Sequence, residues 1–460
     1  SGRSAWMPLP RSMTTPLPGD RSTTSWVPAP NGIIVPASGP ASSALSAFRT
    51  CACSAAASSN MLICSESRDI LLRLTSTNLA SCCNSSASAI RLTAGRSTRS
   101  AAMKPSPRED VSYVNNGTMG QRTSERMRMG ITGSRILVTG GTGSIGSEVV
   151  RQLLSRSPAH VTVFSRDDSK HFYFQQELGE RDDVSFIIGD VRDREGLSRA
   201  FQTGVDIVIH AAALKHVLIC EQNPTEAVKT NILGTQNVVD LAKAHGADVV
   251  LSISTDKAVN PTSMMGASKY VAEKLVIDGN ATGETKCACV RFGNVLGSRG
   301  SVIPSMVKGV KDRGSIWISD RDVTRFAMPI PEAAKLVIDA VELCAGGEIF
   351  VLKMKAFALG QLVDVLLGMN LAPGDVQVDV RGLVRAEKMH EDLVTSDEFA
   401  RLHETDELYV VAPPFPGWQS TIAGLTEVEL EEYNSSHAER FSDDELRGHI
   451  GECIIALGLD

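Results

Sequence analysis

Short apolar segments alternate with segments of helical pattern between residues 135 and 297. The apolar segments read RILVTGG, VTVFSR, VSFIIGD, VDIVIHAAA, VVLSIST and CACVRFGNVLG. Between them stand SEVVRQLLSR, PTEAVKTNILGTQNVVDLAKAHG and GASKYVAEKLVI, which we expect to be helices. Strands that are apolar throughout and alternate with helices form a parallel sheet covered on both faces. We therefore predict an α/β fold with a doubly wound parallel sheet.

A glycine-rich turn, TGGTGSIG, follows the first of these strands and opens a helix. Glycine lets the backbone approach a pyrophosphate, and a helix N-terminus offers N–H groups and a positive dipole end. Because the turn stands between a buried strand and a helix, it predicts a dinucleotide site in a Rossmann-like domain rather than a plain tight turn. The candidate cofactor-binding residues of the turn are Gly140, Thr142, Gly143, Ser144, Ile145 and Gly146.

The end of the second strand, FSRDDSK, bears on which dinucleotide binds. Ser165 and Arg166 come first, and a guanidinium suits a 2′-phosphate through charge-assisted hydrogen bonds. This favours NADP over NAD, while Asp167 is the argument for NAD. Further along the chain we expect contacts to adenine and to the nicotinamide ribose, although these residues also suit ordinary turns and packing; they are Asp190, Val191, Ala211, Ala212 and Ala213.

The first 128 residues differ in composition from the rest. They are rich in Ser, Ala, Thr, Pro and Arg, poor in acids, and lack a sustained hydrophobic period. Such a composition cannot bury enough apolar surface to offset chain entropy, so we predict a disordered extension. A transit peptide, a regulatory tail and an upstream reading-frame extension all fit, and we favour the last, with a start at Met127 or Met129. The predicted division is 1–128, then an NADP-binding domain at 129–300, then a mainly substrate-binding domain with a tail at 301–460.

Composition also excludes several classes of protein. A net charge of −7 over 460 residues is not the basic balance of a nucleic-acid-binding protein. No apolar run reaches the ~18 residues of a membrane span. The ten cysteines show no metal-ligand spacing, which predicts reduced thiols in the cytoplasm and no metal site.

Taken in order, the motifs carry a family resemblance. After the glycine turn come GDVRD, HAAALKHV, TNILGTQNV, STDKA, GASK and RFGNVLGSRGSVIP. From about Ile131 to its end the chain resembles the extended short-chain dehydrogenase/reductases, and within them the inverting UDP-N-acetylglucosamine 4,6-dehydratase and capsule-biosynthesis branch. The resemblance implies a tightly bound NADP, a UDP-sugar substrate and a homo-oligomer. It also implies a reaction that oxidises C4, removes the C5 proton, expels the C6 hydroxyl as water and returns the hydride to C6, with inversion at C5.

The resemblance assigns catalytic roles to the segment STDKA. Thr255 holds the C4 hydroxyl, Asp256 is the acid at C6 and Lys257 is the base at C5. All three follow a strand end, so they can reach the edge of the sheet where ligands bind. A basic lysine needs a lowered pKa, which burial or a neighbouring cation provides. From composition alone, an exposed Asp–Lys pair of no consequence is the alternative.

A methionine replaces the family's usual tyrosine. Lys269 is expected to bind the nicotinamide ribose, and the residue four positions before it is Met265. Methionine cannot take a proton, so the C4 proton must go to Lys257, Lys269 or a relayed water. Tyr270 does not substitute, because one residue's shift turns a helical side chain by about 100°.

The resemblance also suggests substrate contacts, with two departures from the family pattern. Leu218 stands where the family often has Pro, and VRAEK replaces Arg-Pro-Gly-Glu-Lys at 384–388. These departures and Met265 leave two rivals to the dehydratase: a UDP-hexose 4-epimerase or reductase, and a degenerate NADP-binding regulatory protein. The candidate substrate-binding residues are Lys215, Asn294, Ser298, Arg299, Arg325 and Glu387.

Overall fold

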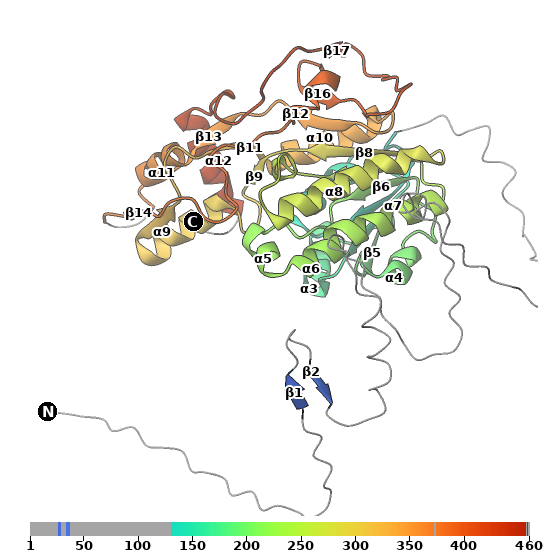
Figure 1. The fold of residues 1–460 in the computed structure, drawn as a ribbon, viewed down its shortest axis with the longest axis horizontal. Helices are drawn as coiled ribbons and strands as arrows, with labels where there is room; N and C mark the ends of the chain where they lie inside the picture. The colour runs from blue at the N-terminus through green and yellow to red at the C-terminus, as the bar shows by residue number, and fades with distance from the viewer. Residues whose placement is uncertain (1–25, 29–33, 37–129, 372–373, 457, 459–460) are drawn as a thin grey trace, which may run out of the picture. The chain divides into compact units, whose positions relative to one another are not determined.

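The computed structural model describes residues 26–28, 34–36, 130–371, 374–456 and 458 (Figure 1). Of the predicted disordered extension, only two short strands are described, β1 (Trp26–Pro28) and β2 (Ile34–Pro36). They pair antiparallel, which the prediction of disorder did not include. The rest of that prediction lies outside the described residues.

A large sheet forms the centre of residues 130–458. Its strands lie in the order β17-β15-β16-β12-β8-β7-β6-β3-β4-β5. All neighbours from β12 to β5 are parallel, and β16, β15 and β17 add an antiparallel edge. The parallel strands are β3 (Arg135–Thr139), β4 (His160–Ser165), β5 (Val184–Ile188), β6 (Ile207–His210), β7 (Val249–Ile253), β8 (Lys286–Arg291) and β12 (Ile349–Leu352). The edge strands are β15 (Leu402–Glu404), β16 (Leu408–Val411) and β17 (Thr426–Glu427).

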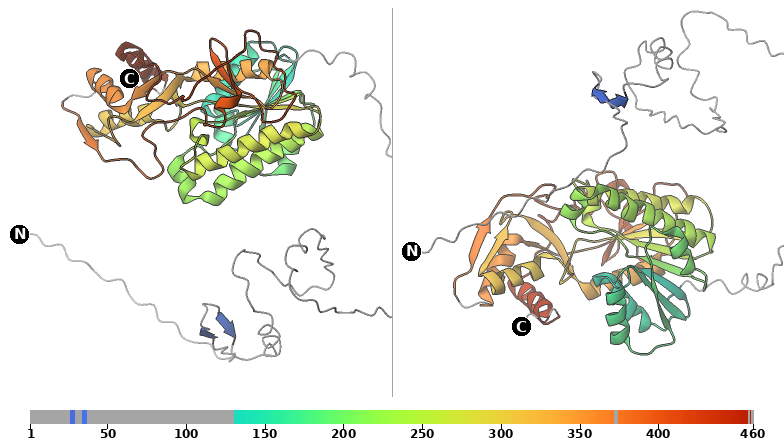
Figure 2. Two further views of the ribbon diagram at one scale, coloured as in Figure 1. Left: turned by 45° about the horizontal axis from the view of Figure 1, so that its top comes forward. Right: turned by 90° about the horizontal axis from the view of Figure 1, so that it is seen from below.

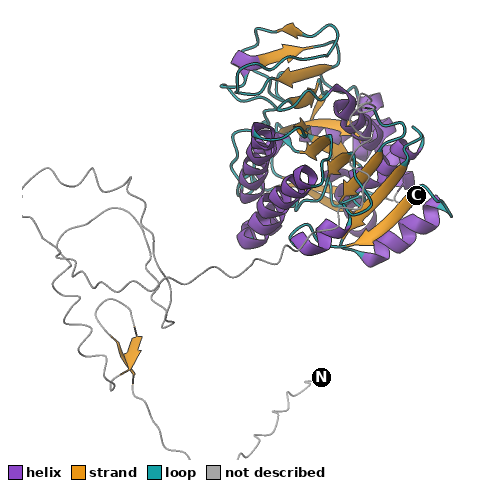
Figure 3. Ribbon diagram, turned by 90° about the vertical axis from the view of Figure 1, so that its right-hand side faces the viewer, coloured by secondary structure: helices purple, strands orange, loops and turns teal. Residues whose placement is uncertain are grey.

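Helices cover both faces of this sheet (Figures 2 and 3). On one face α2 (Ser144–Leu154) packs against α10 (Ile330–Leu343), and on the other α7 (Gly234–Ala244) packs against α8 (Met264–Asp278). The central strands are therefore buried on both sides, which explains their unbroken apolar sequences. Shorter elements complete this half: α3 (Asp168–Leu178), α4 (Arg194–Arg199), α5 (Val217–Gln222), α6 (Pro224–Ala227), and the short helices at Val228–Leu233, Asp256–Ala258, Gly279–Ala281 and Phe399–Arg401.

The strand order reverses next to β3. The chain runs outward from β3 through β4 to β5, then returns to form β6 on the other side of β3. In open parallel sheets, ligands bind in the crevice beyond the carboxyl ends of the strands at such a switch point. The predicted α/β, Rossmann-like doubly wound fold is confirmed.

A smaller group of elements has a core of its own. It contains α9 (Val302–Arg313), α11 (Leu359–Gly368) and α12 (Asp443–Ala456). A capping box begins α12, where Ser442 N donates to Glu445 Oε2 (2.7 Å) and Glu445 N to Ser442 Oγ (3.2 Å). Two small sheets belong to this part: β10 (Ser315–Ile318) with β14 (Gln377–Val380), and β13 (Ala356–Ala358), β11 (Thr324–Pro329) and β9 (Asn294–Leu296).

The chain crosses between the two parts more than once after residue 300. Helix α10 and strand β12 follow that point in the sequence, yet they pack in the large core and in the large sheet. The division at residue 300 stays a prediction, and the site described next draws on both sides of it.

Candidate active site

The glycine turn between β3 and α2 has a geometry that only glycine permits at two places. Gly140 has φ +69°, and a Cβ there would stand 2.7 Å from the backbone nitrogen of Ala212. A Cβ on Gly146 would stand 2.4 Å from the carbonyl oxygen of Gly140. Helix α2 begins at Ser144 without a side-chain cap, so its first N–H groups face the turn. Such a turn can hold a phosphate.

A cavity of about 200 Å³ opens at this turn. Its lining includes Thr230, whose buried Oγ1 has no hydrogen-bond partner among the described residues. A polar ligand would supply that partner, so the residues present fit a dinucleotide. Predicted residues in the lining are Gly140, Thr142, Gly143, Ser165, Arg166, Val191, Ala211, Ala212 and Ala213; the predicted Ser144, Ile145, Gly146, Asp190 and Lys269 are not part of it.

Two basic residues, Arg166 and Lys170, follow the end of β4. Asp167, the residue that argued for NAD, caps α3 by accepting from Lys170 N (3.0 Å) and pairs with Lys170 Nζ (2.8 Å). Arg166 is half-exposed and lies 3.6 Å from Asp190, which Arg192 holds more closely at 2.6 Å. Asp190 is thus engaged by arginines, and its contact with adenine stays a prediction.

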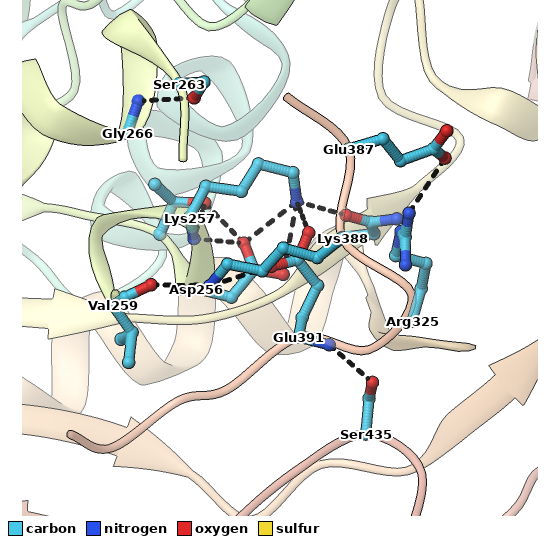
Figure 4. A network of polar contacts seen from close by, with 12 residues as sticks. Asp256, Lys257, Val259, Ser263, Gly266, Arg325, Glu387, Lys388, Glu391 and Ser435 are labelled. Carbon is cyan, nitrogen blue, oxygen red and sulfur yellow. Dashed lines mark hydrogen bonds and ion pairs between the residues drawn. The ribbon is translucent and has the colours of Figure 1, made fainter. Parts of the chain in front are cut away.

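The segment after β7 holds the candidate catalytic residues in one hydrogen-bonded group (Figure 4). Thr255 Oγ1 caps the short helix Asp256–Ala258 and donates to Asp256 Oδ1 (2.7 Å). Asp256 is fully buried, and Lys257 Nζ donates to both of its oxygens, at 3.0 and 3.2 Å. Lys257 Nζ also donates to Asn294 Oδ1 (3.1 Å), on β9. The Asp–Lys pair is therefore interior and fixed.

The charge around Lys257 is opposite to what a resting base needs. Burial lowers its pKa, but the carboxylates of Asp256 and Glu391 outweigh burial, so the pKa of Lys257 is raised. Arg325 opposes this rise without reversing it. The expected lowering is wrong for this arrangement, because Asp256 at 3.0 Å and Glu391 at 3.7 Å both bring negative charge to Nζ.

A second cavity, of about 190 Å³, lies over Lys257. One wall is the segment 384–388, where Ala386 stands in place of the family's glycine and has φ +65°. The turn thus keeps a left-handed conformation without glycine, at a cost of ~1–2 kcal/mol. Besides Lys257 the lining consists of Val217, Leu218, Thr262, Ser263, Arg325, Val384, Arg385, Ala386, Glu387, Lys388 and Glu391.

Helix α8 carries the lysine and the methionine of the GASK region. Lys269 Nζ donates to Ile253 O (2.6 Å), at the end of β7, and burial lowers the pKa of Lys269. Met265 is buried in an apolar cluster with Cys220 and Ala227. Tyr270 is exposed at the surface beneath Lys274, whose Nζ lies 4.8 Å from the ring centroid, so its phenol lies away from the site.

A family model described as polysaccharide biosynthesis protein matches residues 136–413. The chain belongs to this family. It is 37% identical over 286 residues to UDP-N-acetylglucosamine 4,6-dehydratase (inverting) of Campylobacter jejuni, which covers 61% of this chain and 83% of the relative. It is 35% identical over 325 residues to UDP-glucose 4-epimerase of Rickettsia bellii, which covers 68% of this chain and 94% of the relative.

One solved structure is similar over most of residues 130–458. The X-ray structure of Pen from Bacillus thuringiensis shares 35% sequence identity, with a TM-score of 0.66, and covers 72% of this chain and 99% of that chain. The family match and the dehydratase relative confirm the predicted resemblance to the polysaccharide-biosynthesis branch.

Within this family member, the candidate substrate residues fall at two places. Asn294, Arg325 and Glu387 lie at Lys257, and Arg325 Nη2 donates to Glu387 Oε1 (2.9 Å). Arg299 lies instead against the dinucleotide turn, where its guanidinium donates to the Thr142 carbonyl oxygen (3.1 Å). The expected contact of Arg299 with a nucleotide diphosphate stays a prediction.

Two further candidates lie near these contacts. Burial and the charge of Arg299 lower the pKa of Lys215. Ser298 is buried, and its carbonyl oxygen accepts from Ser301 N (2.9 Å). Their substrate contacts stay predictions.

The sequence motifs did not predict several residues of the site. Lys170 and Thr230 line the first cavity, and Lys388 and Glu391 line the second. Lys388 and Glu391 belong to the sequence EKMHE at 387–391, which the chain shares with the family pattern. That shared sequence was the signal from which both residues could have been predicted. Across the described part of the chain no group of three or more His, Cys, Asp or Glu could hold a metal ion. In the same residues no helix has the length and apolar character needed to cross a membrane.

Proposed function

We propose that this protein is a C5-inverting UDP-N-acetylglucosamine 4,6-dehydratase that acts with NADP in polysaccharide biosynthesis. The observation that carries the proposal is the group Thr255, Asp256 and Lys257, fixed after β7 beside the switch-point crevice. The name of the Campylobacter relative supports the same reaction. Its cytoplasmic location and homo-oligomeric state remain predictions.

Each group has a task in this reaction. Bound NADP supplies reversible hydride acceptance at the sugar's C4. Thr255 Oγ1 holds the C4 hydroxyl, since its own proton is directed at Asp256. Lys257 Nζ takes the C5 proton, and the resemblance gives the acid at C6 to Asp256.

The proton of the C4 hydroxyl needs an acceptor other than Met265. Of the two candidate lysines, Lys257 has a raised pKa and Lys269 a lowered one. A lysine with a lowered pKa holds more of its neutral, proton-accepting form at a given pH. The pKa directions therefore favour Lys269 over Lys257 as acceptor of the C4 proton, and Lys269, which lines neither cavity, would receive it through a relayed water.

NADP is the proposed dinucleotide because of the cations at β4. Arg166, Asp167 and Lys170 all line the cavity, and Asp167 is engaged by the cap of α3 and by the ion pair with Lys170. A carboxylate so engaged is a poor partner for a ribose 2′-hydroxyl, and two cations suit a 2′-phosphate. Titration with NADP and with NAD, followed by calorimetry, tests this choice.

A 4-epimerase is the second candidate, and the Rickettsia relative, of which 94% is covered, favours it. A single product assay separates the alternatives. The full chain is incubated with UDP-N-acetylglucosamine, and the products are weighed by mass spectrometry. The dehydratase yields a product lighter by one water. An epimerase yields an isomer of unchanged mass, which proton NMR of the sugar ring separates from unreacted substrate. No reaction of UDP-N-acetylglucosamine or of UDP-glucose, with cofactor bound, refutes both enzymes and leaves the regulatory protein.

A further inference from the structure

One side of the cavity over Lys257 carries no charge. Helix α5 packs against α8 there, and Glu221 Oε1 of α5 accepts from the backbone N–H of Met264, the first residue of α8 (2.5 Å). Two apolar residues at the start of α5 and two hydroxyl residues just before α8 therefore line the cavity together. These four residues, the uncharged wall, are Val217, Leu218, Thr262 and Ser263.

The other residues of the lining are mainly charged. Figure 4 shows Ser263 on one side of the Lys257 side chain, and Arg325 with Glu387 on the other. In a pyranose ring C2 lies opposite C5, so a sugar that presents C5 to Lys257 directs its C2 substituent away from the amine. The uncharged wall suits a substituent that is itself uncharged. The charged lining residues are Lys257, Arg325, Arg385, Glu387, Lys388 and Glu391.

Ser263 has a hydroxyl proton to offer a ligand. Its Oγ accepts from Gly266 N (3.0 Å) as the N-cap of α8, and its proton has no acceptor among the described residues. The hydroxyl of Thr262, in contrast, donates to the Ala386 carbonyl oxygen (3.1 Å). Because Ser263 is buried and buried polar groups are normally hydrogen-bonded, its proton is suited to a carbonyl oxygen that enters the cavity.

Leu218 presents apolar surface to the same cavity. Its side chain is 52% exposed although it lines the cavity. Val217 beside it packs against the apolar cluster that contains Met265. An apolar group of a ligand that covers Leu218 removes this surface from water, which favours binding.

We propose that the uncharged wall recognises the 2-acylamino group of the substrate. Ser263 Oγ donates to the acyl carbonyl oxygen, and Leu218 and Val217 contact the acyl methyl group. This inference rests on the nucleotide-sugar function proposed above. It makes Ser263 and Leu218 the residues that distinguish UDP-N-acetylglucosamine from UDP-glucose, because a 2-hydroxyl offers neither a carbonyl oxygen nor a methyl group.

The test measures the binding of UDP-N-acetylglucosamine and of UDP-glucose by calorimetry. The full chain with bound cofactor carries Lys257→Ala throughout, so that loss of water does not consume the ligand. The measured quantity is the Kd of UDP-glucose divided by the Kd of UDP-N-acetylglucosamine, called the acyl ratio. Leu218→Asn replaces the leucine by a polar residue of similar size. Ile219→Asn is the matched control, since Ile219 is 51% exposed beside Leu218 but does not line the cavity.

Leu218→Asn should lower the acyl ratio ~10-fold, the lower end of what one methylene contributes in an apolar pocket. Ile219→Asn should leave the ratio unchanged. Ser263→Gly should lower it ~3–10-fold through the lost hydrogen bond, whereas Ser263→Thr keeps a hydroxyl and should retain it. Glycine is an acceptable N-cap, so Ser263→Gly removes the hydroxyl with little effect on α8.

An acyl ratio near one before these substitutions would overturn the inference. So would an unchanged ratio in Leu218→Asn, or an equal fall in the Ile219→Asn control. An unchanged ratio in Ser263→Gly would overturn the hydrogen bond assigned to Ser263. Absence of water loss in the protein with Lys257 intact, together with the expected ratios, is a different result: it overturns the proposed reaction and leaves recognition of the acyl group in place.

Discussion

Replacing Glu398 by Gln should lower the free energy of unfolding by about 3 kcal/mol at neutral pH. Glu398 belongs to a buried ion network centred on Arg291, which is 0% exposed. The guanidinium donates to Glu273 at 3.1 and 2.7 Å, to Glu398 at 2.8 and 3.1 Å, and to the Leu393 carbonyl oxygen at 2.9 Å. The network ties β8 to α8 and to the segment that follows Glu391, so it supports three parts of the site.

The magnitude follows from the pKa of Glu398. Burial raises that pKa, but the charge and hydrogen bonds of Arg291 outweigh burial and lower it from 4.5 to about 2. A pKa lowered from 4.5 to about 2 corresponds to about 3 kcal/mol. Because the folded-state pKa is depressed, this stability is present above pH 4.5 and is lost as the pH falls through about 2. The amide also turns an N–H group toward a guanidinium that cannot accept it.

Urea unfolding followed by circular dichroism at several pH values measures this effect. The difference between the wild-type protein and the Gln variant should be full at pH 7 and should shrink as the pH falls below 4.5. Glu445→Gln is a matched control, since Glu445 also has a pKa of about 2 but lies exposed beside Lys355. A control loss as large as that of Glu398→Gln would refute the reasoning, because burial would then not set the size of the effect.

Four further predictions concern the two cavities. Gly140→Ala should weaken dinucleotide binding at least ~10-fold in a calorimetric titration, because the added Cβ meets the Ala212 backbone; unchanged affinity contradicts the assignment. Arg166→Ala should reduce the preference for NADP over NAD by ~10–100-fold in the same titration, and an unaltered ratio would exclude Arg166 from the 2′-phosphate contact. Lys257→Ala should reduce water loss by ~100-fold or more while sparing cofactor affinity; retained turnover removes Lys257 as the base. Ala386→Gly should raise the urea midpoint slightly, by relieving the positive φ, and a lower midpoint would show that glycine's flexibility outweighs the strain.

The sequence predicts the large sheet well because each strand carries its own signal. Apolar strands buried on both faces and a glycine turn at a strand end are local patterns. The antiparallel edge of β15, β16 and β17 was not predicted, since LHE and TE are too short and mixed in polarity to stand out, and the apolar LYVV of β16 is only four residues long. The return of α10 and β12 to the large core is set by long-range packing, which no local pattern encodes.

The sequence predicts only part of the candidate active site, for a related reason. Thr255, Asp256 and Lys257 are adjacent in sequence, so their grouping at one strand end could be predicted. Glu391 comes to Lys257 from more than a hundred positions away, on the segment between β14 and β15. Its charge adds to that of Asp256, and together the two carboxylates raise the pKa of Lys257 against the effect of burial.

The cost of this charge cluster bears on whether the protein is an enzyme or a degenerate relative. Lys257, Asp256 and Glu391 hold one positive and two negative charges in the interior, and burying each ion costs several kcal/mol. Well-packed apolar residues of the same volume are often equally stable or more stable. A protein that only binds NADP has no need of such a cluster, whereas proton transfer at C5 and C6 does. Met265, in contrast, sits in an apolar cluster with Cys220 and leaves the charged groups after β7 in place. The retained cluster therefore favours catalysis with a displaced C4 base over the loss of catalysis.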